Sequence, residues 1–208
     1  MIKKLTVLFI VCSSGILLFS KCADKGTTQE TTSNEDSVKT DDYYGFGSQV
    51  KMGEHLVHIG GCNDCHTPKK MTDHGPELDL DLTLSGHPAN APEPQVNRKE
   101  MESKGLAVTG DLTAWVGPWG VSYTANLTPD STGILGWKEE QFIYAIRNGI
   151  TKGLPGSRPI LPPMPWQEYK NMTDGELKAI FAYLKTLKPI SNVVPPPKPP
   201  VSAPPKKG

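Results

Sequence analysis

The chain has 208 residues, of which 37% are hydrophobic, and its mean hydropathy is −0.38. These values exclude a protein with several membrane spans, each of which needs about 20 mostly apolar residues in a row. Lysine plus arginine and aspartate plus glutamate number 22 each, so no basic excess indicates a nucleic-acid partner. Glycine and proline number 20 each, which predicts one modest core with long loops and an extended tail.

The first 21 residues have the pattern of an export signal. Two lysines are followed by the mostly apolar run Leu5–Phe19, and an uncleaved membrane anchor is the alternative for this run. Such a helix is about 22 Å long, which is shorter than the roughly 30 Å hydrocarbon core of a bilayer. Cys22 follows the run, and the segment resembles a bacterial lipoprotein signal whose cysteine becomes the lipidated first residue. Ordinary cleavage near Ser20 or Cys22 is the alternative.

Two segments of unusual composition flank a central domain expected over residues 43–190. Residues 22–42 have no aromatic side chain and no aliphatic one larger than valine, and they predict a disordered tether. Residues 191–208 are rich in proline and predict an extended, polyproline II tail. This tail is either a docking segment or a solvated tail that lies partly along the domain.

Three helices are expected in the domain, over residues 48–60, over residues 137–148 and from Thr173 to just before Pro189. Thr173 and Glu176 have the spacing of a capping box, and Gly149 is expected to stop the second helix. Residues 68–116, between the first two helices, form a long irregular insertion in which we place no strand. Apolar side chains recur at helical spacing in the three helices: Met52, Leu56, Ile59; Phe142, Ala145, Ile146; Leu177, Ile180, Phe181, Leu184, Leu187.

The motif that indicates chemistry is Cys62-Asn63-Asp64-Cys65-His66, a C-x-x-C-H sequence of the kind that attaches c-type haem. Two cysteines three positions apart lie about one helical turn apart, so both thiols can reach the vinyl groups of one porphyrin. The histidine that follows then lies under the iron as its proximal ligand. Because the chain has one such motif, we expect one covalent haem.

Three other roles for these cysteines fit the sequence less well. A redox-active C-x-x-C is expected near a βαβ pattern, which this sequence does not show. A zinc site needs a second ligand pair, and the sequence has no second C-x-x-C. A disulfide between Cys62 and Cys65 would leave His66 without a role.

Five segments downstream of the motif form a second pattern: Gly117–Gly120, Asn126–Asp130, Thr132–Trp137, Phe142–Gly149 and Pro162–Trp166. Together with Cys62–Thr67 they resemble a class I c-type cytochrome domain. The resemblance is greatest to the cytochrome domains that accompany periplasmic alcohol and sugar dehydrogenases, and it covers about residues 50–190. Two features depart from the family pattern: Leu135 is an extra residue, and residues 68–116 match no segment of that pattern. The dehydrogenase subunits usually carry several haem domains, whereas this chain has one motif.

The resemblance implies Met164 as the sixth ligand of the iron. The flanking Pro162, Pro163 and Pro165 restrict the backbone, so a thioether can be held at the iron with little loss of entropy. A neutral sulfur ligand also raises the reduction potential. The alternative is that Met164 only fills the core, and His87 is the best rival ligand.

Haem propionates are carboxylates and usually contact arginine, tryptophan, tyrosine or backbone donors. The aromatic candidates for this role could instead form the walls of the haem pocket. Asn126 either binds a propionate or organises its own turn. The side chains that could contact the propionates are Arg147, Arg158, Trp115, Trp119, Tyr123 and Trp166.

These expectations combine into an all-α, class I cytochrome c domain around one haem c, with a long irregular insertion and disordered tails. The implied function is single-electron transfer between redox proteins, or with a membrane dehydrogenase or oxidase, and the chain is expected to be an electron carrier and no enzyme. Its expected place is the periplasmic side of a bacterial membrane, held by a lipid at Cys22 or free in the periplasm. One alternative is a haem enzyme or a gas or redox sensor with an open sixth position, and another is a cytochrome subunit of a periplasmic dehydrogenase.

Overall fold

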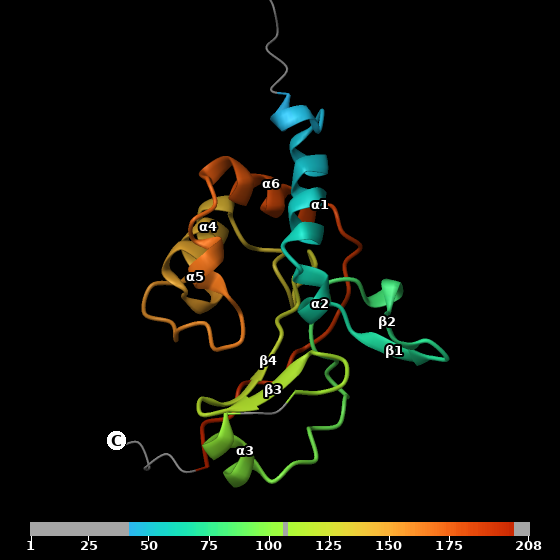
Figure 1. Cartoon of the computed structure of the whole chain (residues 1–208). Coiled ribbons are helices and arrows are strands. Elements are labelled where there is room, and N and C mark those ends of the chain that lie inside the picture. Colours follow the sequence, from blue (N-terminus) through green and yellow to red (C-terminus); the bar gives the residue numbers. More distant parts are fainter. Residues whose placement is uncertain (1–41, 106–107, 202–208) are drawn as a thin grey trace, which may run out of the picture. The chain divides into compact units, whose positions relative to one another are not determined.

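The computed structural model describes residues 42–105 and 108–201, all within the second of the two compact units of the chain, Lys39–Gly208 (Figure 1). The predicted signal over residues 1–21, Cys22 and the tether up to residue 41 lie outside the described residues. In the described part, no helix is both long enough and apolar enough to cross a membrane.

Helices and two short hairpins alternate along the described residues (Figure 1). The α-helices are α1 (Gln49–Ile59), α2 (Cys62–His66), α3 (Arg98–Lys104), α4 (Glu139–Asn148), α5 (Trp166–Tyr169) and α6 (Asp174–Leu184). Three turns of 3-10 helix are η1 (Tyr43–Gly45), η2 (Leu80–Leu82) and η3 (Thr151–Gly153). The strands are β1 (Lys69–Thr72) paired with β2 (Gly75–Leu78), and β3 (Ala114–Gly117) paired with β4 (Gly120–Tyr123), both antiparallel.

The three predicted helices are present as α1, α4 and α6, and local signals fix their ends. The side chain of Ser48 accepts a hydrogen bond from the backbone of Lys51 at the start of α1. Thr173 and Glu176 form the predicted capping box of α6. Gly149 ends α4 with φ of 62°, as a C-terminal glycine does. Helix α6 ends at Leu184, earlier than expected, although Leu187 still packs against the core.

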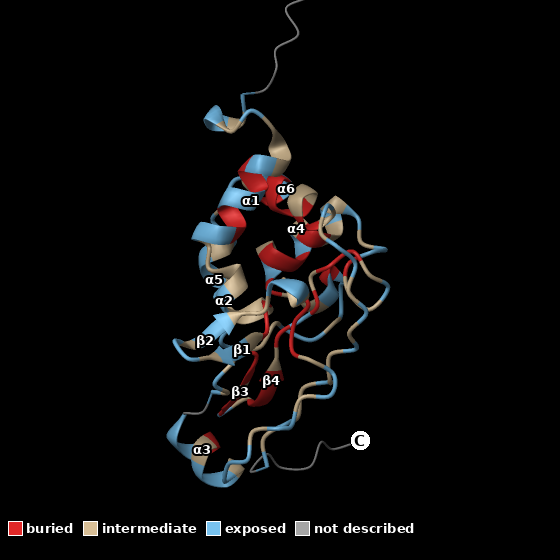
Figure 2. Ribbon diagram, turned by 90° about the vertical axis from the view of Figure 1, so that its right-hand side faces the viewer, coloured by how far each residue is buried: buried red, intermediate tan, exposed pale blue. Residues whose placement is uncertain are grey.

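The core lies where α1, α4 and α6 face one another, and buried residues also continue through β3 and β4 (Figure 2). The predicted apolar faces of α4 and α6 are buried. The prediction for α1 is wrong at its last position, because Ile59 is 67% exposed. Val57 is fully buried in its place, next to Leu56.

Helices α1 and α6 cross so closely that the contact requires a glycine. A Cβ atom added to Gly53 would lie 1.9 Å from the backbone oxygen of Ala179 and 2.9 Å from Cβ of Tyr183. Backbone atoms cannot move aside without separating the two helices, so the crossing depends on the missing side chain.

We expect Gly53→Ala to lower the free energy of unfolding by about 3 kcal/mol, at the upper end of the usual cost of overpacking. Chemical denaturation of both proteins would measure the loss. Gly175→Ala is the matched control, because a Cβ there lies no closer than 3.9 Å to any neighbouring atom. Equal stability of the two variants would contradict the close crossing.

The all-α prediction is correct only in part, because the structure contains two hairpins: β1–β2 lies inside the segment expected to be irregular, residues 68–116, and β3–β4 begins at its end. The β3–β4 hairpin turns at Pro118-Trp119, between the paired Gly117 and Gly120. Val116 and Val121 are buried partners in this ladder, which explains why a short hairpin is stable against the core. The β1–β2 hairpin directly follows the cysteine motif and is mostly exposed.

The C-terminal segment also differs from the disordered tail that was expected, because residues 190–201 lie along the domain. The backbone of Lys198 pairs with Val121 through bonds of 2.9 and 3.0 Å. The backbone N–H of Val201 donates to the carboxylate of the buried Glu102 at 2.8 Å. These contacts use the non-proline residues of the segment, whose N–H groups remain free to donate.

Candidate haem site

A cavity of about 230 Å³ lies beside the cysteine motif. It is much larger than the voids that close-packed cores leave, and its wall is mostly apolar, so it suits a large flat ligand better than water. The wall is built from α1, α2, β4, α4 and α6 and from the segment before α5. The groups on it that could bind a haem and its iron are Cys62, Cys65, His66 and Met164.

Cys62 and Cys65 are free thiols at the two ends of one turn of α2, so their side chains share a face of the helix. Burial raises the pKa of Cys62 to about 11 and also raises the pKa of Cys65. Both thiols are therefore protonated near neutral pH. Their common face lies toward the cavity, as attachment of one porphyrin through two thioethers requires.

The ring of His66 is oriented by one hydrogen bond. Its Nδ1 atom lies 2.8 Å from the backbone oxygen of Ala125. A carbonyl oxygen only accepts, so Nδ1 carries the proton and Nε2 keeps its lone pair for a metal. Burial lowers the pKa of His66, which keeps the imidazole neutral. His66 is thus held in the tautomer that an axial iron ligand needs, with Nε2 free to bind the metal.

The segment that carries Met164 is tied to the β3–β4 hairpin. The hydroxyl of Ser122 donates to the backbone oxygen of Pro162 at 2.7 Å and accepts from the indole N–H of Trp119 at 3.1 Å. On the other side, the hydroxyl of Tyr169 donates to the backbone oxygen of Gly60 at 2.6 Å. These bonds fix the segment from both sides of the cavity.

The structure divides the six predicted propionate contacts into two groups. Trp115, Tyr123 and Arg158 are on the cavity wall. Arg147 is engaged elsewhere, in an ion pair with Asp174 at 2.6 Å and a hydrogen bond to the backbone oxygen of Lys170. The remaining two are Trp119, which holds Ser122, and Trp166, which packs against Gly149.

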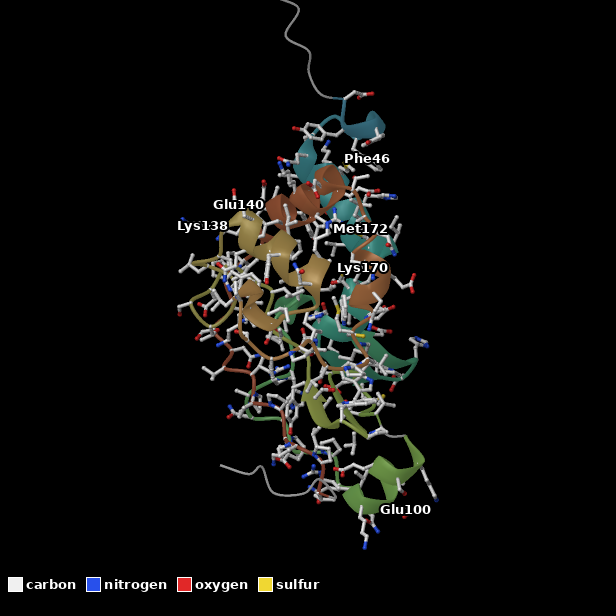
Figure 3. All side chains as sticks on the ribbon, turned by 90° about the vertical axis from the view of Figure 1, so that its left-hand side faces the viewer. Phe46, Glu100, Lys138, Glu140, Lys170 and Met172 are labelled. Carbon is white, nitrogen blue, oxygen red and sulfur yellow. The ribbon has the colours of Figure 1, made fainter. Side chains whose placement is uncertain are left out.

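Two wall residues were not predicted from the sequence. Lys152, in the short 3-10 turn η3, is on the wall together with Arg158, and neither forms an ion pair within the described residues. Among the residues that the structure describes, no aspartate or glutamate is on the wall, so these two cations leave it positively charged. Met172 is a second methionine on the wall, in the short connection between α5 and α6 (Figure 3).

Other predicted residues lie away from the cavity. His87 is 1% exposed and is not on the wall, and its Nδ1 atom lies 2.7 Å from the hydroxyl of Thr113. The side chain of Asn126 organises its turn, because its oxygen accepts from the backbone and the hydroxyl of Thr128 at 2.9 and 2.8 Å. Its nitrogen donates to Ile190 in the C-terminal segment.

Burial lowers the pKa of His87, and this predicts an acid-labile fold. Below about pH 6.5 the unfolded chain binds a proton at this histidine that the folded chain does not bind. The free energy of unfolding therefore falls as the pH drops from 6.5 to the pKa in the folded state, and this contribution is constant below it. Denaturation of the wild type and His87→Asn across this range would test this; parallel curves would contradict it.

Known proteins with similar sequences include dehydrogenase subunits. The chain is 35% identical over 149 residues to one subunit of the nicotinate dehydrogenase of Pseudomonas putida, covering 71% of this chain and 9% of that protein. It is 27% identical over 135 residues to the gluconate 2-dehydrogenase cytochrome c subunit of Pantoea cypripedii, covering 64% of this chain and 22% of that protein. Over 75 residues, it is 39% identical to the fructose dehydrogenase cytochrome subunit of Gluconobacter japonicus, covering 35% of this chain and 15% of that protein.

The chain is a relative of dehydrogenase cytochrome c subunits. This confirms the resemblance that the sequence segments indicated. The matches cover between 9% and 23% of the length of these relatives, so the chain corresponds to a part of each. No family model matches the chain.

Proposed function

We propose that this cytochrome c relative binds one haem c in the described cavity and transfers single electrons, as the electron-transfer partner of a dehydrogenase. The observation that carries the proposal is the convergence of two thiols, a neutral imidazole and a thioether on one apolar cavity. The three residue types are those that hold c-type haem.

The residues of the cavity fit the group. Cys62 and Cys65 would hold the porphyrin covalently, and His66 and Met164 would be the axial ligands. Haem c supplies one-electron exchange between ferric and ferrous iron. The two prolines before Met164 and the one after it limit backbone motion, so the sulfur keeps its place in both oxidation states. A fixed ligand set makes the reorganisation on electron transfer small.

The charge of the cavity supports the same assignment. Two propionates bring two negative charges, and the wall offers the cations of Lys152 and Arg158 with no carboxylate. Burial lowers the pKa of Arg158, because its charge is partly desolvated, and an anion beside it would stabilise that charge. We therefore assign the propionates to these two residues, with Trp115 and Tyr123 beside them.

The names of the relatives support a dehydrogenase as the redox partner. Gluconate, fructose and alcohol dehydrogenases each have a cytochrome subunit similar to part of this chain. Electron transfer from a dehydrogenase is therefore the role proposed for this chain, in which no substrate is transformed at the iron. The proposal places the chain on the periplasmic side of a bacterial membrane, tethered through a lipid at Cys22.

Absorption spectra of the purified protein test the cofactor and the ligation together. We expect the bands of a six-coordinate c-type haem in the oxidised and the reduced protein, and no change when carbon monoxide is added to the reduced form. A shifted Soret band with carbon monoxide would show an open sixth position and favour the haem enzyme or sensor. Absence of a covalent haem would refute the proposal.

A further inference from the structure

The segment Leu84–His87, here named the clasp, lies inside the insertion of residues 68–116, in which the sequence offered only His87, as a rival ligand. Its side chains include two of the most deeply buried in the described residues, Leu84 and His87, at 0% and 1% exposure. None of its four residues is on the cavity wall. The clasp therefore serves something other than direct contact with the cavity.

The clasp bonds to the cysteine motif on one side. The backbone N–H of Gly86 donates to the backbone oxygen of His66 at 2.8 Å. The backbone N–H of Leu84 donates to the hydroxyl of Thr67 at 2.9 Å. Both atoms that it contacts belong to the candidate proximal ligand or to the residue after it.

The other side of the clasp bonds to the segment that accepts the hydrogen bond of His66. The backbone N–H of His87 donates to the backbone oxygen of Thr124 at 3.1 Å, and Leu127 donates to Leu84 at 2.8 Å. Between these two bonds lies Ala125, whose oxygen is 2.8 Å from Nδ1 of His66. The clasp thus bridges the donor and the acceptor of that bond.

Gly86 touches the acceptor itself. A Cβ atom there would lie 2.5 Å from the carbonyl carbon of Ala125 and 2.6 Å from its oxygen. The φ angle of Gly86 is +79°, which also favours glycine. Any side chain at this position would push the peptide that holds His66.

The imidazole of His87, the next residue, anchors the two residues that precede Ala125. Its ring lies 4.9 Å from that of Tyr123, which precedes Thr124. Its Nδ1 bonds to the hydroxyl of Thr113, whose backbone oxygen accepts from the N–H of Thr124 at 3.0 Å.

The carboxylate behind Thr113 fixes the direction of this chain of bonds. The hydroxyl of Thr113 donates to Asp111 at 2.6 Å. Burial raises the pKa of Asp111, but hydrogen bonds from Thr109 and Thr113 outweigh it and hold this pKa below its usual range, so the carboxylate only accepts. Nδ1 of His87 is therefore the donor to Thr113.

The C-terminal segment completes the arrangement. The side-chain nitrogen of Asn192 donates to the backbone oxygens of Ser85 and His87 at 2.7 and 2.9 Å. Its side-chain oxygen accepts from the backbone of Ala89 at 2.8 Å. One asparagine thus satisfies two of the four backbone carbonyls of the clasp and holds the clasp in one conformation.

We propose that the clasp positions the proximal ligand: Gly86 and His87 hold residues Thr124 and Ala125 where the carbonyl of Ala125 accepts the proton of His66 Nδ1. The assignment rests on the proposed function for its effect on the iron. A strong bond from Nδ1 makes the imidazole a better electron donor and stabilises ferric iron. Loosening the clasp then favours the ferrous state.

The test uses the full chain in two variants with matched controls. Gly86→Ala displaces the acceptor. Its control is Gly105→Ala, at a glycine of similar φ, +75°, where an added Cβ would have no atom of the described residues within 4 Å. His87→Leu removes the ring that anchors Tyr123 and Thr113, and its control is His74→Leu, in the exposed turn between β1 and β2. His87→Asn keeps a donor near the position of Nδ1, so it should restore part of what His87→Leu loses. If Gly86→Ala fails to fold, the two His87 variants carry the test.

Two readouts separate this proposal from the proposed function. Hydrogen exchange at His66 Nδ1, followed by NMR, needs no iron, and we expect about tenfold faster exchange in Gly86→Ala and His87→Leu than in the controls. In the haem-loaded protein, the ratio of ferrous to ferric iron at a fixed ambient potential should rise severalfold in the same variants. An exchange rate at His66 Nδ1 and a ferrous-to-ferric ratio equal to those of the controls would refute the proposed role of the clasp. Loss of the haem spectrum in the wild type would instead refute the proposed function, with the exchange result still decisive for the clasp.

Discussion

Replacing Met164 with alanine is expected to lower the reduction potential and to open the iron to external ligands. Alanine carries no donor atom, so the sixth position would be taken by water or left vacant, and the ferric state would be favoured. Axial ligands span a range of roughly 0.8 V, and we expect a shift on the order of 0.1 V or more. Redox titration and the carbon monoxide spectrum of the reduced protein measure the two effects.

Met172→Ala is the matched control for this experiment. Met172 is also half-buried, packs against the same core and is on the same cavity wall. The two substitutions therefore remove the same atoms from similar surroundings. They differ in that the sequence pattern assigns Met164, and not Met172, as the axial ligand. A fall in potential with Met172→Ala and none with Met164→Ala would move the axial ligand to Met172.

Cys65→Ala is expected to yield little haem-loaded protein. Cys65 supplies one of the two thioethers, and its thiol is on the cavity wall one turn from Cys62. Loss of one attachment point leaves the porphyrin free to rotate about the other, so that His66 no longer meets the iron in a fixed geometry. Haem content per milligram of purified protein, with haem staining of a denaturing gel, measures the loss.

Asp64→Ala is the control for the cysteine substitution. Asp64 lies between the two cysteines on the same short helix, and its side chain is exposed and makes no hydrogen bond in the described structure. We expect this variant to keep its haem. A normal haem content in Cys65→Ala would contradict covalent attachment through that residue.

Local sequence signals predicted the parts of the molecule that short stretches of chain determine. The capping box at Thr173, the stop at Gly149 and the apolar faces of α4 and α6 each depend on residues within a few positions of one another. The cysteine motif belongs to the same class, because its five residues form one helix. Such features can be read without knowing the rest of the fold.

The features that the sequence did not reveal depend on contacts between distant segments. Ile59 has the spacing of a core residue, but α1 ends there and its side chain has no element to pack against. The acceptor for His66 is a backbone oxygen, and every residue type has one, so no letter in the sequence marks Ala125. Lys152 joins the cavity only because its loop folds back against α4.

The bond from Asn192 to the clasp joins residues that are 107 positions apart. During synthesis, the cysteine motif is complete long before Asn192 exists, and closing so long a loop is an entropic cost that is met late in folding. The thiols can thus be presented to the attachment chemistry while the residues that orient the proximal ligand are still unassembled. A chain that ends at residue 189 would keep every assigned haem ligand but lack Asn192, the side chain that holds the clasp. Such a chain would show whether the proximal ligand can be present without being correctly positioned.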